Sequence, residues 1–226
     1  MSRIYTYFGA LVGLVCAYFV VRLVFFTDLT TRTVPADVLQ GVLLGCGLAL
    51  VTALIIGRIR ATTSHGWTTM YGCGRPGNGM FFRAAQAWAF PGPITVPEEA
   101  MYWRTTSDGS GRTLDGHRDY VMHFEPGRLP PTTAFWSLTM GDGRNRYVPN
   151  PLDRYHVGDR SGLVPNADGS VDVYIQRQAP VGHEPNWLPA PAGSFILWLR
   201  VYLPGREIVE RTYSVPPVEV SHARGI

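Results

Sequence analysis

The amino-acid sequence predicts a membrane-anchored, mainly-β protein, in which two transmembrane helices and two short helices precede a jelly-roll-like antiparallel β-sandwich. Two long uncharged apolar runs near the N-terminus predict the membrane helices. Short alternating segments separated by Gly and Pro turns predict the sandwich. The composition agrees with an anchored protein, because charged residues make up only 16% of the 226 residues, well below the value of about 25% in typical soluble domains.

The apolar runs extend from Ile4 to Val21 and from Val38 to Ile56. At about 1.5 Å per helical residue, each run approaches the bilayer core thickness of roughly 30 Å. A signal peptide and a buried soluble hairpin are the alternatives, and the length of both runs favours the membrane. We therefore expect a transmembrane hairpin over residues 1–60, with helices at about 4–26 and 38–57, and a multi-pass protein of the plasma membrane.

The charge distribution excludes a general nucleic-acid binder. The chain has 20 basic and 17 acidic residues, and the excess of positive charge lies within residues 1–60, beside the apolar runs. The rest of the chain is neutral and therefore lacks the basic surface that phosphate backbones require. If the N-terminus lies inside, Arg3, Arg58 and Arg60 share the cytoplasmic side, which weakly favours a cytoplasmic position for the globular domain.

Turn and cap residues divide the chain after the hairpin. Residues 61–78 are rich in Gly, Thr and Ser and predict a linker. Asn78 can cap a helix over about 79–90, which Pro91 ends. The run Thr95-Val96-Pro97-Glu98 has the pattern of a capping box and predicts a second short helix over about 97–104. Residues 79–217 then form one domain, and residues 218–226 form a tail.

The β-sandwich is expected over about residues 115–217. Its strands are predicted from alternation and flanking turns at His117–Phe124, Thr133–Met140, Ser170–Gln178, Ser194–Leu203 and Ile208–Tyr213. The segment Ser194–Leu203 is apolar on both faces apart from Arg200, which predicts a central strand.

Several motifs resemble a known bacterial family. They are FWSLT at Phe135–Thr139, DGS at Asp168–Ser170, NWLPAP at Asn186–Pro191 and LRVYLP at Leu199–Pro204, with EEAMYW at Glu98–Trp103 upstream. In this order they are similar to the "domain of unknown function 1214" family, over about residues 65–217. The resemblance implies a jelly-roll-type sandwich and no established activity. Its members are often exported or membrane-anchored, which favours an extracytoplasmic domain. Many of them carry a companion domain upstream, where this chain has its two predicted membrane helices.

A ligand pocket is the most specific functional expectation. Aromatic faces beside an arginine suit carbohydrate rings or anionic headgroups. The side chains expected to line such a pocket are Trp136, Tyr155, His156, Asn186, Trp187 and Arg200. In the alternative interpretation, Trp187 fills the core and Arg200 pairs with a buried acid such as Asp168 or Asp172.

Other motifs give no catalytic residue, metal site or cofactor. Gly72–Gly77 matches GxGxxG but follows no predicted strand, so a flexible tether is the simpler interpretation. His117, Asp119 and His123 alternate on one strand face and, with Asp115, form a conceivable metal face without a compact ligand motif. Ser137 lies outside a GxSxG elbow, although a triad with His123 or His156 stays open.

These observations predict a noncatalytic binding or interaction module at the cell envelope, or an accessory subunit of a membrane assembly. The expected partners are the membrane and, beyond it, other membrane-protein subunits, lipid or glycan, but not nucleic acid. The alternative is an envelope hydrolase or lyase that acts on glycan or lipid.

Overall fold

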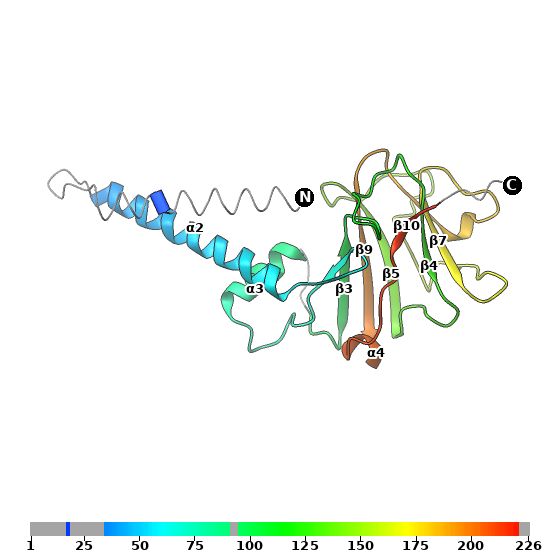
Figure 1. The fold of residues 1–226 in the computed structure, drawn as a ribbon, viewed down its shortest axis with the longest axis horizontal. Helices are drawn as coiled ribbons and strands as arrows, with labels where there is room; N and C mark the ends of the chain where they lie inside the picture. Colours follow the sequence, from blue (N-terminus) through cyan, green and yellow to red (C-terminus); the bar gives the residue numbers. More distant parts are fainter. Residues whose placement is uncertain (1–16, 19–33, 91–94, 222–226) are drawn as a thin grey trace. The chain divides into compact units, whose positions relative to one another are not determined.

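The computed structural model describes residues 17–18, 34–90 and 95–221, and for residues 34–38 only the backbone. The described chain separates into two compact units (Figure 1). One holds the helices up to Arg60 together with the segment 77–90, and the other holds residues 61–76 and 95–221. The helix predicted at 4–26 lies outside the described residues, except for Ala17 and Tyr18, which are helical.

Helix α2 (Val34–Arg60) confirms the second predicted apolar helix and extends it at both ends. Its stretch Leu39–Arg60 is long and apolar enough to cross a membrane, and none of this stretch is buried within the protein. Arg58 and Arg60 lie in its last turn, where cations favour the helix dipole. Within the described part of the chain, one helix meets these criteria, so the second membrane crossing stays a prediction.

Helix α3 (Met80–Ala89) confirms the short helix predicted at 79–90. Gly79, rather than Asn78, occupies the N-cap position, and the amide of Phe90 donates to the carbonyl of Gln86 at the C-terminal end. Helix α3 packs against α2, where the Arg60 guanidinium lies 5.4 Å from the centre of the Phe82 ring.

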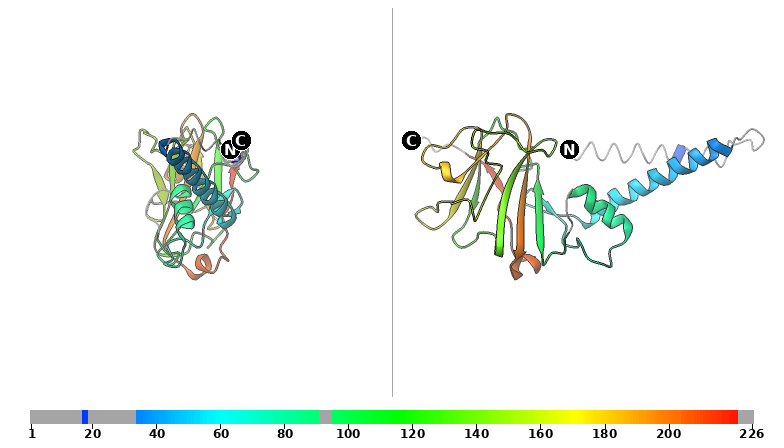
Figure 2. Two further views of the ribbon diagram at one scale, coloured as in Figure 1. Left: turned by 90° about the vertical axis from the view of Figure 1, so that its left-hand side faces the viewer. Right: turned by 180° about the vertical axis from the view of Figure 1, so that it is seen from behind.

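The β domain consists of two sheets that share one apolar core (Figures 1 and 2). The larger sheet has the order β1 (Thr62–Ser64), β2 (Trp67–Thr69), β3 (Ala100–Thr105), β9 (Phe195–Pro204), β5 (Thr132–Asp142), β6 (His156–Gly158), with every pair antiparallel. The smaller sheet has the order β10 (Val218–Val220), β4 (Tyr120–Phe124), β7 (Val171–Gln176), β8 (Trp187–Pro189). Its pair β7–β8 is parallel, unlike the antiparallel pairing predicted. A short 3-10 helix, η1 (Glu184–Asn186), precedes β8, and the short helix α4 (Arg206–Val209) follows β9.

Strand β9 lies between β3 and β5 and fixes the register of both. Its residues Leu197, Leu199 and Val201 are fully buried in the core, together with side chains of the smaller sheet such as Val173 and Ile175. Because side chains alternate along a strand, the residues between them point to the opposite face of the larger sheet.

The prediction of a helix at 97–104 is wrong, because residues 100–105 form strand β3. The capping-box pattern gives only one turn, in which the amides of Glu99 and Ala100 donate to the carbonyl of Val96. From Ala100 onward, every residue of β3 pairs with β9. This pairing across the sheet outweighs the local helical signal.

The ends of the predicted domain also differ from the structure. The segment expected as a linker contains the hairpin β1–β2, whose turn at His65 and Gly66 has positive φ at both residues. Trp67 of this hairpin is buried, and its indole nitrogen donates to the carbonyl of Pro216. The expected tail contains β10, and the strand expected at 208–213 is replaced by α4 and a turn. The domain therefore begins near Thr62 and extends to Val220.

We expect Leu199→Ala to lower the free energy of unfolding by about 2–5 kcal/mol, because it leaves a cavity in a fully buried position of β9. The measurement is urea unfolding of the full chain in detergent micelles, followed by tryptophan fluorescence. The control is Val164→Ala, whose side chain is 55% exposed and whose effect should stay within about 0.5 kcal/mol. Equal effects of the two substitutions would contradict the placement of β9 at the centre of the core.

Candidate functional site

One face of the larger sheet, opposite the core, carries arginine, hydroxyl and aromatic side chains. On β9 these are Trp198, Arg200 and Tyr202, which alternate with the core residues. Tyr102 of β3 and Ser137 of β5 lie directly opposite Arg200 on the two neighbouring strands. We call this surface the Arg200 face and define it by Tyr102, Arg104, Phe135, Ser137, Thr139, His156, Trp198, Arg200 and Tyr202.

Arg200 is half-buried at the centre of this face. Its Nη1 donates to the hydroxyl Oγ1 of Thr139 at 3.3 Å. Among the described residues, no carboxylate oxygen forms an ion pair with its guanidinium, and the residues that define the Arg200 face include no acid. The predicted pairing of Arg200 with Asp168 or Asp172 is wrong, because both acids belong to a polar network on the smaller sheet, described below.

Aromatic rings support the face beside Arg200. Tyr202 stacks on Phe135 with ring centres 4.5 Å apart and meets Tyr102 edge to face at 6.3 Å. Partial burial raises the pKa of the Tyr102 hydroxyl, and the positive charge of Arg200 acts in the opposite direction. A hydrogen bond with Thr95 lowers this pKa more than Arg200 does, and because the net effect is a raised pKa, the Tyr102 hydroxyl stays protonated at neutral pH.

This arrangement favours the binding of an anion. A guanidinium presents its N–H donors in a planar fork that matches two oxygens of a carboxylate or phosphate group. The hydroxyls of Ser137 and Thr139 are buried beside it and can donate to, or accept from, further ligand oxygens. A second guanidinium, that of Arg104, lies over the ring of Trp198 at 5.7 Å and adds positive charge to the same face.

His156 also belongs to this face, as the pocket prediction requires. It lies exposed on β6, directly opposite Thr139 of β5. Tyr155 precedes it, and a hydrogen bond between its hydroxyl and Asp153 raises the pKa of that hydroxyl. The structure thus brings Arg200 and His156 to either side of Thr139.

The remaining predicted pocket residues lie elsewhere. Trp136 is buried in the core, where its ring meets Phe124 at 5.5 Å. Trp187 is 8% exposed at the edge of the smaller sheet, and its Nε1 donates to the carbonyl of Gln176. Asn186 is buried and bonds the backbone of Val164 through both its oxygen and its nitrogen. These three residues hold the fold together and do not line the Arg200 face.

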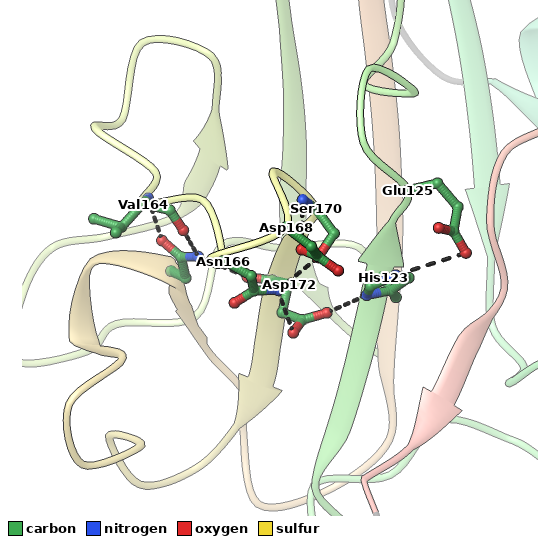
Figure 3. Close-up of polar contacts among 8 residues, drawn as sticks. His123, Glu125, Val164, Asn166, Asp168, Ser170 and Asp172 are labelled. Atoms are coloured by element: carbon green, nitrogen blue, oxygen red, sulfur yellow. Dashed lines mark hydrogen bonds and ion pairs between the residues drawn. The ribbon is translucent and has the colours of Figure 1, made fainter.

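A second polar network lies on the smaller sheet (Figure 3). His123 of β4 and Asp172 of β7 are cross-strand partners, and His123 Nδ1 lies 2.6 Å from Asp172 Oδ1. Asn166 donates from its amide nitrogen to Asp172 and to the hydroxyl of Ser170, which in turn donates to Asp168. The hydrogen bond to Asp172 raises the pKa of His123. The network joins the loop before β7 to β4.

The predicted metal face, the GxGxxG segment and the possible Ser137 triad have local structural roles. His117 Nδ1 lies 2.5 Å from Asp115 Oδ1, so it pairs locally and apart from His123. Within the described part of the chain, no three metal-binding side chains gather at one point. In the GxGxxG segment, Gly74 has a positive φ and packs directly against the backbone of Thr95. Ser137 faces Arg200 on the larger sheet, whereas His123 lies on the smaller one.

The fold and the site define a two-sheet β domain with a basic, hydroxyl-rich face, in a chain that also contains an apolar helix. Comparison with protein families then supports the resemblance seen in the motifs. Residues 99–206 match the family described as "Protein of unknown function (DUF1214)". No curated protein matches the chain.

Crystal structures that show similarity to the chain include two of bacterial proteins. The VPA0106 protein from Vibrio parahaemolyticus is 25% identical with a TM-score of 0.60, over 84% of this chain and 47% of that protein. A putative uncharacterized protein from Burkholderia cenocepacia is 16% identical with a TM-score of 0.37, over 82% of this chain and 44% of that protein. The chain thus spans less than half the length of either protein.

Sequence reasoning missed the neighbours of Arg200. The alternation of side chains along a strand is a signal that could have placed Trp198 and Tyr202 on the same face as Arg200. Ser137 and Thr139 were visible on a predicted strand, but their position opposite Arg200 depends on the register of β5 and β9. The position of Tyr102 on this face could not be predicted, because its segment has the pattern of a helix and not of a strand.

We expect protonated His123 to stabilise the folded protein. Because the hydrogen bond to Asp172 holds the pKa of His123 above its usual value, the stabilisation is fully present below pH of about 6.5. It is lost as the pH rises through the higher pKa of the folded state. The free energy of unfolding should therefore differ most between the natural protein and His123→Gln at low pH, and the difference should shrink on raising the pH. Urea unfolding at a series of pH values measures it.

The variant Asp172→Asn provides the control, because it keeps the shape of the acceptor and removes its charge. The imidazole of His123, followed by proton NMR, should titrate at lower pH in this variant. A difference between natural protein and His123→Gln that stays constant with pH would contradict the predicted coupling.

Proposed function

We propose that this protein is a membrane-anchored binding module of the cell envelope that holds a small anionic ligand on the Arg200 face without catalysing its conversion. Helix α2 supports the membrane anchor by its length and composition. The exposed apolar side chains of α2, such as Leu43, Leu48 and Ile55, also fit contact with lipid or with other membrane-protein subunits. An accessory role in a membrane assembly is part of the same proposal.

The surroundings of Arg200 are the observation that carries the binding proposal. A half-buried guanidinium has lost part of its hydration and is stabilised most by an anion that accepts two parallel hydrogen bonds. The Arg200 guanidinium donates to a neutral hydroxyl, that of Thr139, at the long distance of 3.3 Å. A bound carboxylate or phosphate group would supply the negative charge, and the hydroxyls of Tyr102 and Ser137 lie on the neighbouring strands to bind its remaining oxygens.

Acidic glycans and lipid headgroups share this chemistry, so the test uses a probe for each. The natural chain and Arg200→Gln, in lipid nanodiscs, are titrated calorimetrically with glucuronate and with inorganic phosphate. We expect the natural chain to bind at least one probe and Arg200→Gln to bind it roughly tenfold or more weakly, since a charge-assisted pair contributes about 1.5–3 kcal/mol. Arg200→Lys should bind with intermediate affinity, because it keeps the charge and loses the planar fork.

The matched control is Arg177→Gln, which removes an exposed arginine at the end of β7. Glucose serves as the uncharged probe and should not bind measurably. Equal affinity of the natural chain and Arg200→Gln for a probe would contradict the proposal that Arg200 binds the ligand. Binding of glucose as tightly as glucuronate would contradict the proposal that the ligand is an anion.

We further propose that the β domain lies outside the cytoplasm, as the family resemblance implies and against the charge distribution around the helices. Cys73 tests this position, because the other cysteines lie in the apolar runs. Burial raises the pKa of the Cys73 thiol to about 11, so labelling with a membrane-impermeant maleimide needs a mildly alkaline buffer. We expect labelling of intact cells, and none in Cys73→Ser. Labelling only after permeabilisation would place the domain in the cytoplasm.

A further inference from the structure

Helix α3 exposes an apolar face that its own unit does not cover. One of its ten residues is charged, namely Arg83. Phe82, Ala85 and Gln86 are buried on one side, whereas Met80 is 73% and Trp88 66% exposed on the other. Met80, Ala84 and Trp88 follow one another at a spacing of four, so they form a single stripe, which Phe81 widens. A helix that is apolar on both sides is unusual at a water-exposed surface.

The position of α3 within its unit indicates what covers this face. Helix α3 lies beside the C-terminal part of α2 (Figure 1), where Arg60 meets Phe82. Arg58 and Arg60 end an apolar helix of membrane-spanning length, and basic side chains at such an end lie at the level of the lipid headgroups. The exposed side of α3 therefore lies at the same level as these headgroups.

The side chains of α3 suit this level of the bilayer. Tryptophan concentrates at the membrane interface, because its ring lies among acyl chains while its N–H reaches the headgroups. Phenylalanine is common on the apolar face of interfacial helices. Arg83, at the border of the exposed stripe, can pair with lipid phosphate. A helix at this level lies in the plane of the membrane surface with its apolar face among the headgroups and upper acyl chains, and the other side of α3 is covered by its own unit.

We propose that α3 is an interfacial helix, whose face of Met80, Phe81, Ala84 and Trp88 lies among the lipid headgroups and upper acyl chains beside the end of α2. The inference rests on the membrane anchoring proposed above and adds a second, in-plane attachment to it. It is independent of any ligand at Arg200.

Trp88 allows a direct test, because each of the other five tryptophans is at most 8% exposed. The full chain is reconstituted into vesicles of phosphatidylcholine and phosphatidylglycerol, with and without lipids brominated near the headgroup end of their acyl chains. We expect bromine to quench part of the tryptophan emission of the natural chain. The quenching should be lost in Trp88→Phe, an exposed substitution that should leave the fold intact by circular dichroism. Phe135→Leu, which alters a ring of the Arg200 face, is a control that should keep the quenching.

Each other result overturns the proposal in a distinguishable way. A chain that does not float with the vesicles would refute the anchor as well as the interfacial helix. A chain that floats with the vesicles but shows no bromine quenching, or the same quenching in Trp88→Phe, would refute only the interfacial helix. If Trp88 is protected from aqueous acrylamide but not quenched by bromine, its face is covered by protein, either a second copy or another subunit.

Discussion

The pairing of β9 with both β3 and β5 is the constraint on which the β domain depends. Hydrogen bonds on both sides hold β9 in register over nearly its whole length. Its inward residues, such as Leu199, join the core with the smaller sheet. The same register leaves Arg200 on the opposite face, in the middle of a sheet, where the backbone cannot move to bring it into water. The apolar core and the basic face are therefore two consequences of one strand, since alternate residues serve each of them.

Most of the longer periodic elements can be predicted from the sequence, and the three-residue strands cannot. Strand β3, with six residues, is the exception, because its segment follows a helix-capping pattern. The segments of α2, α3, β4, β5, β7 and β9 each carry enough residues for an apolar pattern to emerge. The strands β1, β2, β6, β8 and β10 have three residues each, so that alternation gives almost no signal. Trp67, inside the expected linker, is a bulky residue that its hydrophobicity should place in a core, as are Met70 and Tyr71 after it.

The candidate site was predictable only in part, for a physical reason. Arg200 and His156 were expected to share a site, and they do flank Thr139. Trp187 is expected beside them because a tryptophan ring and its N–H suit a ligand pocket. In the structure the ring is buried at the edge of the smaller sheet, and the N–H donates to the backbone carbonyl of Gln176. Residue type alone cannot distinguish these uses, because the choice depends on which sheet the strand joins.

The way in which the domain uses its other arginines strengthens the interpretation of Arg200. Arg112 pairs with Asp108, Arg146 with Asp142 and Arg206 with Glu210, in each case with an acid four residues away along the chain. Such pairs tie turns and short helices locally, and the arginine of each pair is more than half exposed, so that the loss of its partner would cost this arginine little. Arg200 is less hydrated than these side chains, so it has more to gain from an acid, yet hydroxyls surround it. Arg200 differs even from the half-buried Arg154, whose guanidinium donates to the backbone carbonyls of Glu184 and Trp187 at 2.7 and 2.9 Å, because its own partner is a hydroxyl at 3.3 Å. Its neutral surroundings instead leave the negative charge to be supplied from outside the chain, which is the property expected of a binding residue.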